Sequence, residues 1–375
     1  MNATSSPPPD TECFGHAVPP FAAVFPKVFR AGLDAMTLAQ IDELATALSE
    51  TDRQCLADFL GPRTAETLAG LPKDKIDRLA THYQAAGDPD EEAFRAVYPQ
   101  VAAMTNNVLS VDQLRSVLTA LSPEDMASQS FFFGDEGRAV AFSTMKPDRI
   151  EATLDHTADW VLLASAKRAI EAIDSYTATL EKQERMGRKM QGVETIAIKV
   201  RQQPCALYMK WLAGPHKGRE LIYNAPLLGT HKVRVREAGL LGVMPVTIAI
   251  DGAAARRGTN HLVTEVGLQP LVQLIETDYQ KAAPRGDIQR RNHGIADLDG
   301  RQVYRMESIL PRDPTLGYFC HRIMHYTDYI RGLEVKIEVY NFDNKLDESH
   351  HYRDIDTTAP LTEADFDPQN RANRL

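Results

Sequence analysis

One pattern recurs through the second half of the chain: apolar and polar residues alternate with a period of two, in one segment after another. Ile196, Ile198 and Val200 fall on one face of an extended segment, and the residues between them fall on the other. Residues 333–340 alternate in the same way. Because successive side chains of a strand point to opposite faces, each segment has one apolar and one solvated face. An antiparallel sheet of such strands must bury its apolar face against a second sheet, a helix or an apolar ligand.

The composition limits the class of protein. A chain of 375 residues is long enough for two domains, and 43% hydrophobic with 25% charged residues excludes wholesale disorder. The 51 acidic and 42 basic residues give a net charge of -9, which argues against sequence-independent binding to nucleic acid. No segment approaches the ~20 consecutive apolar residues of a membrane-spanning helix. We therefore expect a folded protein with no nucleic-acid partner and no transmembrane segment.

The cysteines and the N-terminus bear on the compartment. Four cysteines are scattered without CxxC spacing, so neither a zinc ribbon nor a dense disulfide scaffold is indicated. A Cys205–Cys320 disulfide in an oxidising compartment is one alternative, and two buried free thiols are the favoured one. Residues 1–20 lack the basic and apolar regions of a signal peptide, so we expect no export signal in this sequence.

Three regions follow from the change in period along the chain. Residues 1–33 are rich in proline and predict an extended arm. Residues 34–156 show apolar stripes with helical spacing, with Thr37 and Ser49 as expected N-caps, and predict a helical domain. Residues 157–375 predict an antiparallel β domain.

The helical region also contains an internal echo. The pattern of residues 40–52, which begins with Gln40, recurs 73 residues later from Gln113. Two alternatives explain it: an old duplication of a helical unit, or chance similarity between two capped amphipathic helices.

The third region predicts an α+β fold in which a curled antiparallel sheet wraps helices. We expect a helix at about 158–175 and another at about 268–283. Turn residues separate the strand candidates. The expected strands are 176–185, 193–201, 206–212, 219–223, 232–236, 289–298, 302–310, 318–328, 333–342 and 348–354.

Several sequence segments in this region resemble a bacterial family, the domain of unknown function family 1571, which is similar to the LolA-like lipoprotein-carrier superfamily. The resemblance covers about residues 160–370 and says nothing about residues 1–155. The segments that carry it, in order, are Ile173–Leu180, Lys182–Arg185, Arg201–Pro204, Tyr208–Leu212, Lys217–Leu221, Asn260–Leu268 and Leu361–Pro368.

The resemblance implies a LolA-like half-barrel whose concave apolar face is covered by helices. Relatives in the wider superfamily hold acyl chains or lipid-anchored proteins there, usually in the periplasm. The family has no catalytic residues to carry over. A periplasmic location is therefore implied by resemblance, and a cytoplasmic one is the alternative because no signal peptide is apparent.

A half-barrel of this kind suggests a set of residues that line a cavity for an apolar ligand. The alternative for each of them is ordinary packing in the core, because most buried apolar residues do no more than pack. Met209 and Trp211 stand out, as an adaptable side chain and a large amphipathic one. The candidate lining residues are Ile196, Ile198, Val200, Leu207, Met209, Trp211, Leu221 and Tyr223.

The sequence gives less support for a metal site. His321, His325, His350 and His351 lie late in the chain, but two histidines four residues apart on a strand are about 13 Å apart, too far to share a metal. A neighbouring strand would be needed to complete a site, and metal sites usually need three or four ligands. We predict no metal, no cofactor and no catalytic residue.

A histidine with an acidic neighbour could serve as a general base. His231, His261 and His293 are the candidates, but no nucleophile motif such as GxSxG accompanies them. An unrecognised hydrolase or metal enzyme is therefore the weakest of the hypotheses.

Two other hypotheses of function have more support than the hydrolase or metal enzyme. The first is a non-enzymatic carrier or sensor that shelters a lipid, an acyl chain or a lipidated protein in the half-barrel. The second is a scaffold that docks a protein partner through the helical domain, with a solidly packed barrel. Phe131–Phe133 motivates the second, as an apolar run that could dock one domain on another.

Overall fold

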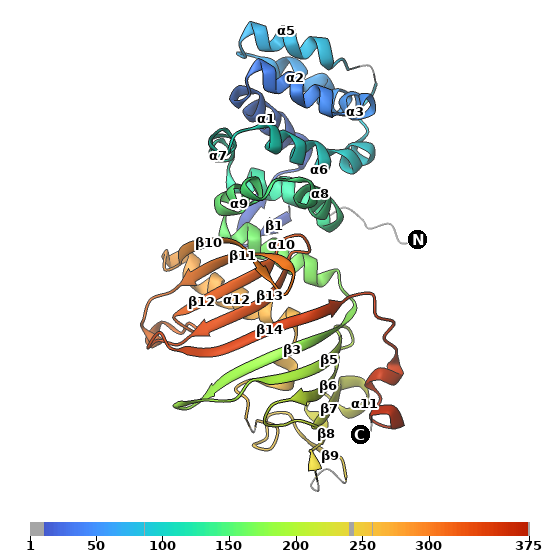
Figure 1. Cartoon of the computed structure of the whole chain (residues 1–375), viewed down its shortest axis with the longest axis vertical. Helices are drawn as coiled ribbons and strands as arrows, with labels where there is room; N and C mark the ends of the chain where they lie inside the picture. The colour runs from blue at the N-terminus through green and yellow to red at the C-terminus, as the bar shows by residue number, and fades with distance from the viewer. Residues whose placement is uncertain (1–10, 86, 240–243, 257, 374–375) are drawn as a thin grey trace. The chain divides into compact units, whose positions relative to one another are not determined.

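The computed structural model describes residues 11–85, 87–239, 244–256 and 258–373 (Figure 1). The chain divides into two compact units. The helical unit takes in the chain up to Ser165 together with Tyr329–Gly332, and the sheet unit comprises Ala166–Asp328 and Leu333–Leu375. The predicted boundary between residues 156 and 157 falls before this division, in the link between two helices.

Capped amphipathic helices build the helical unit. Four of them begin at a serine or threonine whose side chain accepts from the backbone N–H three residues on, with a reciprocal bond back to the cap: Thr37, Ser49, Ser110 and Ser122. The helices are α1 (Phe21–Ala35), α2 (Leu38–Ala47), α3 (Glu50–Leu60), α4 (Thr64–Leu68), α5 (Lys73–His82), α6 (Glu91–Val108), α7 (Val111–Ala120), α8 (Pro123–Thr144), α9 (Pro147–His156) and α10 (Asp159–Glu171), the last of which crosses the division.

The predicted extended arm is wrong from Thr11 onwards. Two short paired strands, β1 (Thr11–Cys13) and β2 (His16–Val18), precede α1. Phe21 and Phe25 of α1 are buried in the aromatic core, because the helical spacing of apolar residues outweighs the local proline content. The prolines at positions 7–9 lie outside the described residues.

The aromatic core also accounts for two residues of the run Phe131–Phe133. Phe132 is buried, and its ring centroid lies 4.5 Å from that of Phe21. The ring of Phe133 packs 5.6 Å from that of Tyr98. Both side chains therefore pack within the helical unit, contrary to the expectation that this run docks another domain.

The echo between residues 40 and 113 has a structural counterpart. The Gln40 and Gln113 side-chain amides hydrogen-bond each other, at 2.9 and 3.0 Å for the two donor–acceptor pairs. Gln40 also donates to the carbonyl of Val108, and Gln113 donates to that of Ala35. Since Ala35 and Val108 are themselves 73 positions apart, the two bonds are equivalent, as expected for two copies of one helical unit.

The sheet unit consists of an antiparallel sheet whose strands mostly follow chain order. The exception lies at its centre, where the first long strand pairs with the last: the order is β10-β11-β12-β13-β14-β3-β5-β6-β7-β8-β9, with β4 attached to β3. The strands are β3 (Ser175–Met186), β4 (Lys189–Met190), β5 (Glu194–Arg201), β6 (Ala206–Ala213), β7 (Glu220–Asn224), β8 (Lys232–Arg236), β9 (Val246–Ala249), β10 (Gln289–Leu298), β11 (Arg301–Ile309), β12 (Arg322–Asp328), β13 (Leu333–Tyr340) and β14 (Leu346–Asp356).

Helix α12 (Leu268–Ala282) is tied to one face of this sheet. The backbone N–H of Leu268 donates to the hydroxyl of Tyr176 on β3, and that of Gly267 donates to the hydroxyl of Tyr352 on β14. We call the face that carries these tyrosines the inner face. The outer face of β6 and β7 packs instead against Phe366 near the C-terminus. The predicted fold class, a helical region followed by an open antiparallel sheet with a covering helix, is confirmed. Among the described helices, none combines the length and the apolar run that crossing a bilayer requires.

Candidate functional site

The eight predicted lining residues all lie on the inner face. Cross-strand pairing places Ile196 opposite Trp211, Ile198 opposite Met209, and Val200 opposite Leu207. Met209 and Leu207 lie opposite Leu221 and Tyr223 on β7. All eight are buried, with exposed fractions between 0% and 8%. We call this set the apolar face; that its members line a cavity stays a prediction.

The apolar face continues to the edge of the sheet, where it becomes exposed. Val233 and Val235 on β8 are buried, and they lie opposite Ile248 and Val246 on the edge strand β9. Val246 is 51% exposed. The inner face is thus buried at its centre and accessible to solvent along β9.

Trp211 carries an unusual polar atom on the apolar face. Its indole Nε1 is buried and has no hydrogen-bond acceptor among the described residues. The guanidinium of Arg219 lies 5.2 Å from the centroid of the indole ring. Because a buried donor without an acceptor is costly, this N–H is available to a polar atom of a bound molecule.

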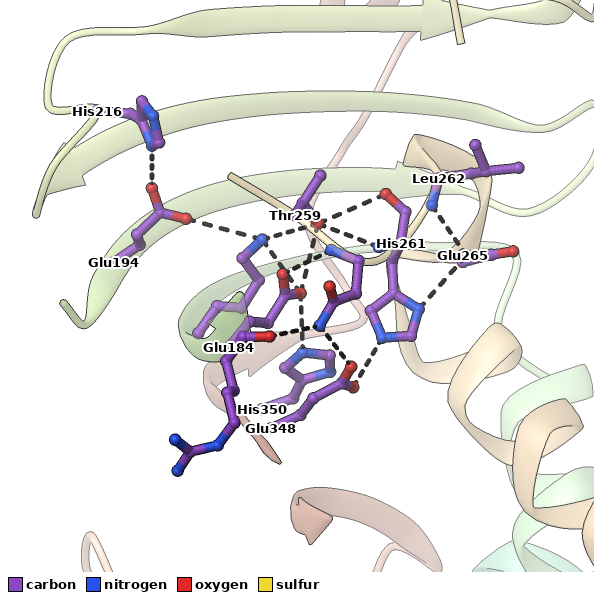
Figure 2. A network of polar contacts seen from close by, with 12 residues as sticks. Glu184, Glu194, His216, Thr259, His261, Leu262, Glu265, Glu348 and His350 are labelled. Carbon is purple, nitrogen blue, oxygen red and sulfur yellow. Dashed lines mark hydrogen bonds and ion pairs between the residues drawn. The ribbon is translucent and has the colours of Figure 1, made fainter. Parts of the chain in front are cut away.

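At the far end of β3 the inner face changes from apolar to charged. Tyr176, Ala178 and Leu180 are followed, in the same alternation, by Lys182 and Glu184. Register then places acidic and imidazole groups beside them, with Glu348 opposite Glu184, and both His350 and Glu194 opposite Lys182. We call this group, with Asn260 and His261 from the segment before α12, the polar end (Figure 2).

The contacts at the polar end are dense. Glu184 accepts from the backbone N–H of Asn260 at 2.9 Å, and its carboxylate lies 3.3 Å from the ammonium of Lys182. Glu348 lies 2.7 Å from Nε2 of His261 and accepts from the Asn260 side chain at 3.2 Å. The two glutamates are 2% and 3% exposed. Burial of this degree makes every unmatched charge expensive.

A second arm of the network runs to Glu194. Its carboxylate lies 3.7 Å from the ammonium of Lys182 and is hydrogen-bonded to the imidazole of His216. Lys182 therefore lies between the carboxylates of Glu184 and Glu194, and Figure 2 labels both glutamates.

Electrostatics keep these glutamates ionised. Burial alone would raise the pKa of Glu184, but the neighbouring His350 imidazole, the Lys182 charge and the Asn260 N–H lower it to about 2. Burial is likewise outweighed at Glu348, where the hydrogen bond and charge of His261 lower the pKa. The same two glutamates raise the pKa of His261 against the effect of its burial.

Three side chains of the polar end could hold a metal ion. Glu184, His261 and His350 each offer one ligand atom, and these atoms all lie within 4.8 Å of one another. Of the four late histidines weighed from the sequence, only His350 belongs to this group. His321 contacts Leu310 and Arg312, and His325 contacts Ser308.

Sequence reasoning missed this cluster for two reasons. The approach of Glu184 to His350 depends on the pairing of β3 with β14, which are far apart in the chain. His261 comes from a segment without strand or helix periodicity. The two-residue alternation did contain one usable signal, since it puts Glu348 and His350 on one face.

The cysteines add no reactive group to the site. Cys205 and Cys320 are both free, so the disulfide alternative is not realised. Cys320 is buried as expected, whereas Cys205 is exposed. Burial raises the pKa of Cys320 and keeps it as the thiol, which is a poor nucleophile and metal ligand.

The family described as "Protein of unknown function (DUF1571)" matches residues 173–375. The chain belongs to this family. The match begins just before β3 and takes in the apolar face and the polar end, while the part of the helical unit up to Ser165 precedes it. The family predicted from the sequence is therefore confirmed. The comparison with curated proteins gave no match for this DUF1571 member.

The comparison with solved structures found matches that each cover about half of this chain. The lipoprotein LppX of Mycobacterium tuberculosis shares 12% identity at a TM-score of 0.35, over 55% of this chain and 99% of that one. LprF of Mycobacterium bovis shares 14% at 0.31, over 54% and 93%. A LolA superfamily protein of Nitrosomonas europaea shares 10% at 0.26, over 55% and 96%. At these identities and scores, the resemblance says nothing about function.

Proposed function

We propose that this protein is a non-enzymatic binding protein that shelters a lipid or an acyl chain against the apolar face. The observation that carries the proposal is the course of the apolar face, from a buried centre at Ile196 and Met209 to the exposed edge at Val246. A ligand can enter along β9 and extend inwards without crossing a polar layer. Each buried methylene contributes ~0.8 kcal/mol, so a long chain binds tightly with few polar contacts.

Two further features support an amphiphilic ligand. The indole N–H of Trp211 finds no acceptor in the described part of the chain, which suits a ligand with an ester, amide or carboxyl oxygen. Met209 beside it is flexible and polarizable, and such side chains adapt to ligands of different shape.

The proposed function also bears on where the protein is located. A lipid-binding role of this kind belongs in the periplasm, as the superfamily resemblance implies, and cell fractionation tests it against a cytoplasmic location. The scaffold alternative loses part of its motivation, because Phe132 and Phe133 pack within the helical unit, and it keeps the other part, the helical unit itself.

Native mass spectrometry of gently purified protein, followed by solvent extraction, tests the proposed function. We expect a co-purified lipid or acyl species, and binding of a fluorescent fatty acid by the delipidated protein. Protein that carries no such species and binds no amphiphile would overturn the proposal.

A pair of surface variants locates the binding site. Val246→Asp places a charge at the exposed edge of the apolar face and should weaken fatty-acid binding about tenfold, the equivalent of ~1.4 kcal/mol. Leu227→Asp is the matched control, because Leu227 is 57% exposed and lies in α11 (Ala225–Leu228), outside the apolar face. Equal effects of the two substitutions would place the ligand elsewhere.

A further inference from the structure

The polar end brings metal-ligating side chains together from three separate segments. Glu184 comes from β3, His350 and Glu348 from β14, and His261 from the segment that leads into α12. The side chains of His261 and His350 are 15% and 13% exposed, and those of the two glutamates are nearly inaccessible. Two strands of the sheet thus position Glu184, Glu348 and His350, and the segment before α12 supplies His261.

We propose that Glu184, His261 and His350 bind a divalent transition-metal ion of the Zn²⁺ class, with the fourth position of the ion open to water. Imidazole nitrogen and carboxylate oxygen are ordinary ligands of this ion, in tetrahedral sets of four. The site lies apart from the apolar face, and its proposal stands independently of lipid binding.

Distances between the ligand atoms fit the ion after the side chains close on it. Atoms that each lie ~2.1 Å from one ion are ~3.4 Å apart in a tetrahedron. The ligand atoms of the three residues lie within 4.8 Å of one another. The widest pair must therefore close by up to about 1.4 Å, through side-chain rotation, to reach tetrahedral geometry.

An unpartnered nitrogen marks the position of the ion. Nε2 of His350 is buried and accepts or donates no hydrogen bond among the described residues. The carboxylate of Glu184 lies 3.5 Å from it, an ion-pair distance with no hydrogen bond. Buried polar atoms are nearly always satisfied, so a buried nitrogen that faces a carboxylate without bonding it suits an ion placed between them.

Groups behind the ligands hold them in orientation. Nδ1 of His261 lies 3.3 Å from the carboxylate of Glu265, while its Nε2 faces Glu348. A metal-binding histidine characteristically gives its second ring nitrogen to a carboxylate in this way. Asn260 bonds Glu184 through its backbone and Glu348 through its side chain, and so fixes both carboxylates.

The net charge of the polar end is negative, which favours a bound dication. Among the residues that the structure describes, three buried carboxylates, those of Glu184, Glu194 and Glu348, face one permanent cation, Lys182. A divalent ion balances the remaining two negative charges. The rival account is a metal-free network in which protons on the imidazoles supply that charge, and experiment can separate the two.

Calorimetric titration of the full-length, chelator-treated protein with Zn²⁺ alone tests the site. We expect one Zn²⁺ per chain, and a loss of affinity of at least about 100-fold in both His350→Gln and Glu184→Gln. His351→Gln is the matched control, because His351 is adjacent on β14 but contacts Glu181 and Asp299 on the other face. It should bind as the wild type does. Circular dichroism confirms that each variant is folded.

Two further measurements test the site even if a ligand variant does not fold. One uses the Glu265→Gln variant, and the other uses wild-type protein with Co²⁺. Glu265→Gln, at a half-exposed position, should weaken Zn²⁺ binding about 10- to 100-fold. Wild-type protein with Co²⁺ should show the visible absorption of a tetrahedral site with nitrogen and oxygen ligands. No stoichiometric Zn²⁺ binding by the wild type, or equal binding by wild type and His350→Gln, would overturn the proposal in favour of the metal-free network.

Discussion

At the scale of single residues, Glu307 shows how the sheet tolerates buried charge. This glutamate is 2% exposed and is held by the guanidinium groups of Arg322 and Arg291, the latter at 3.1 Å. Burial alone would raise its pKa, but the two arginines lower it below the ordinary value of 4.5. Glu307 therefore stabilises the folded state in its ionised form.

The pH dependence of stability follows from the sign of this shift. Because the folded pKa lies below the unfolded one, the contribution is complete above about pH 4.5 and is lost as the pH falls through the folded value. Glu307→Gln should cost about 2–3 kcal/mol at pH 7 and reduce the acid sensitivity of urea unfolding. Asp343→Asn, at an exposed turn position, serves as the control and should change neither quantity. An unchanged pH profile in Glu307→Gln would contradict the assignment.

Residue positions on the apolar face could be predicted because strand geometry is local. A period of two assigns Ile196, Ile198 and Val200 to one side without knowledge of any partner strand. The polar end required more, since Glu184 meets Glu348 only through a pairing that the sequence does not display. Loop residues such as His261 have no periodic signal at all.

At the scale of elements, the pairing of Gln40 and Gln113 joins α2 to α7. Their half-buried amides bond each other and each bonds a helix-end carbonyl, so replacing either one removes two hydrogen bonds from the other.

A double-mutant cycle on these glutamines measures that dependence. We expect Gln40→Ala and Gln113→Ala each to cost about 1–2 kcal/mol, and the double variant to cost less than their sum by about 1 kcal/mol. Gln54→Ala, on an exposed part of α3, is the control and should cost little. Chemical denaturation gives all four values, and strict additivity would show that the amides act separately.

Elements differed in how well the sequence predicted them. The strands from β3 to β14 were largely anticipated, apart from the short β4 and the edge strand β9, whose few residues give too little alternation. Helix α8 was missed because Gly134, with a positive φ of 62°, interrupts it and its apolar residues are spread around the helix. Helix α1 was missed because prolines obscured its stripe.

At the scale of the whole molecule, the helical unit has a hydrophobic core of its own. Phe94 lies at its centre, stacked on Phe59 at 3.8 Å and in edge contact with Phe25 at 4.9 Å. The family match begins only at residue 173, so the unit lies outside the matched region except for Tyr329–Gly332.

Independent folding of this unit is the expected outcome. A fragment of residues 11–172 should melt cooperatively and show helical circular dichroism, because its core is complete without the sheet. Phe94→Ala in the same fragment should cost about 3–5 kcal/mol. A fragment that shows no cooperative transition would contradict the assignment of two units.

The matched hydrogen bonds of Gln40 and Gln113 have a consequence for the ancestry of the chain. A single 73-residue copy has one such glutamine, and the bonds between the two amides require a second copy. The duplication interpretation therefore implies an ancestor whose single copy paired with another through the same amides, whereas chance similarity implies no such ancestor. Equivalent positions outside this contact also match, since Thr37 and Ser110 cap their helices in the same way.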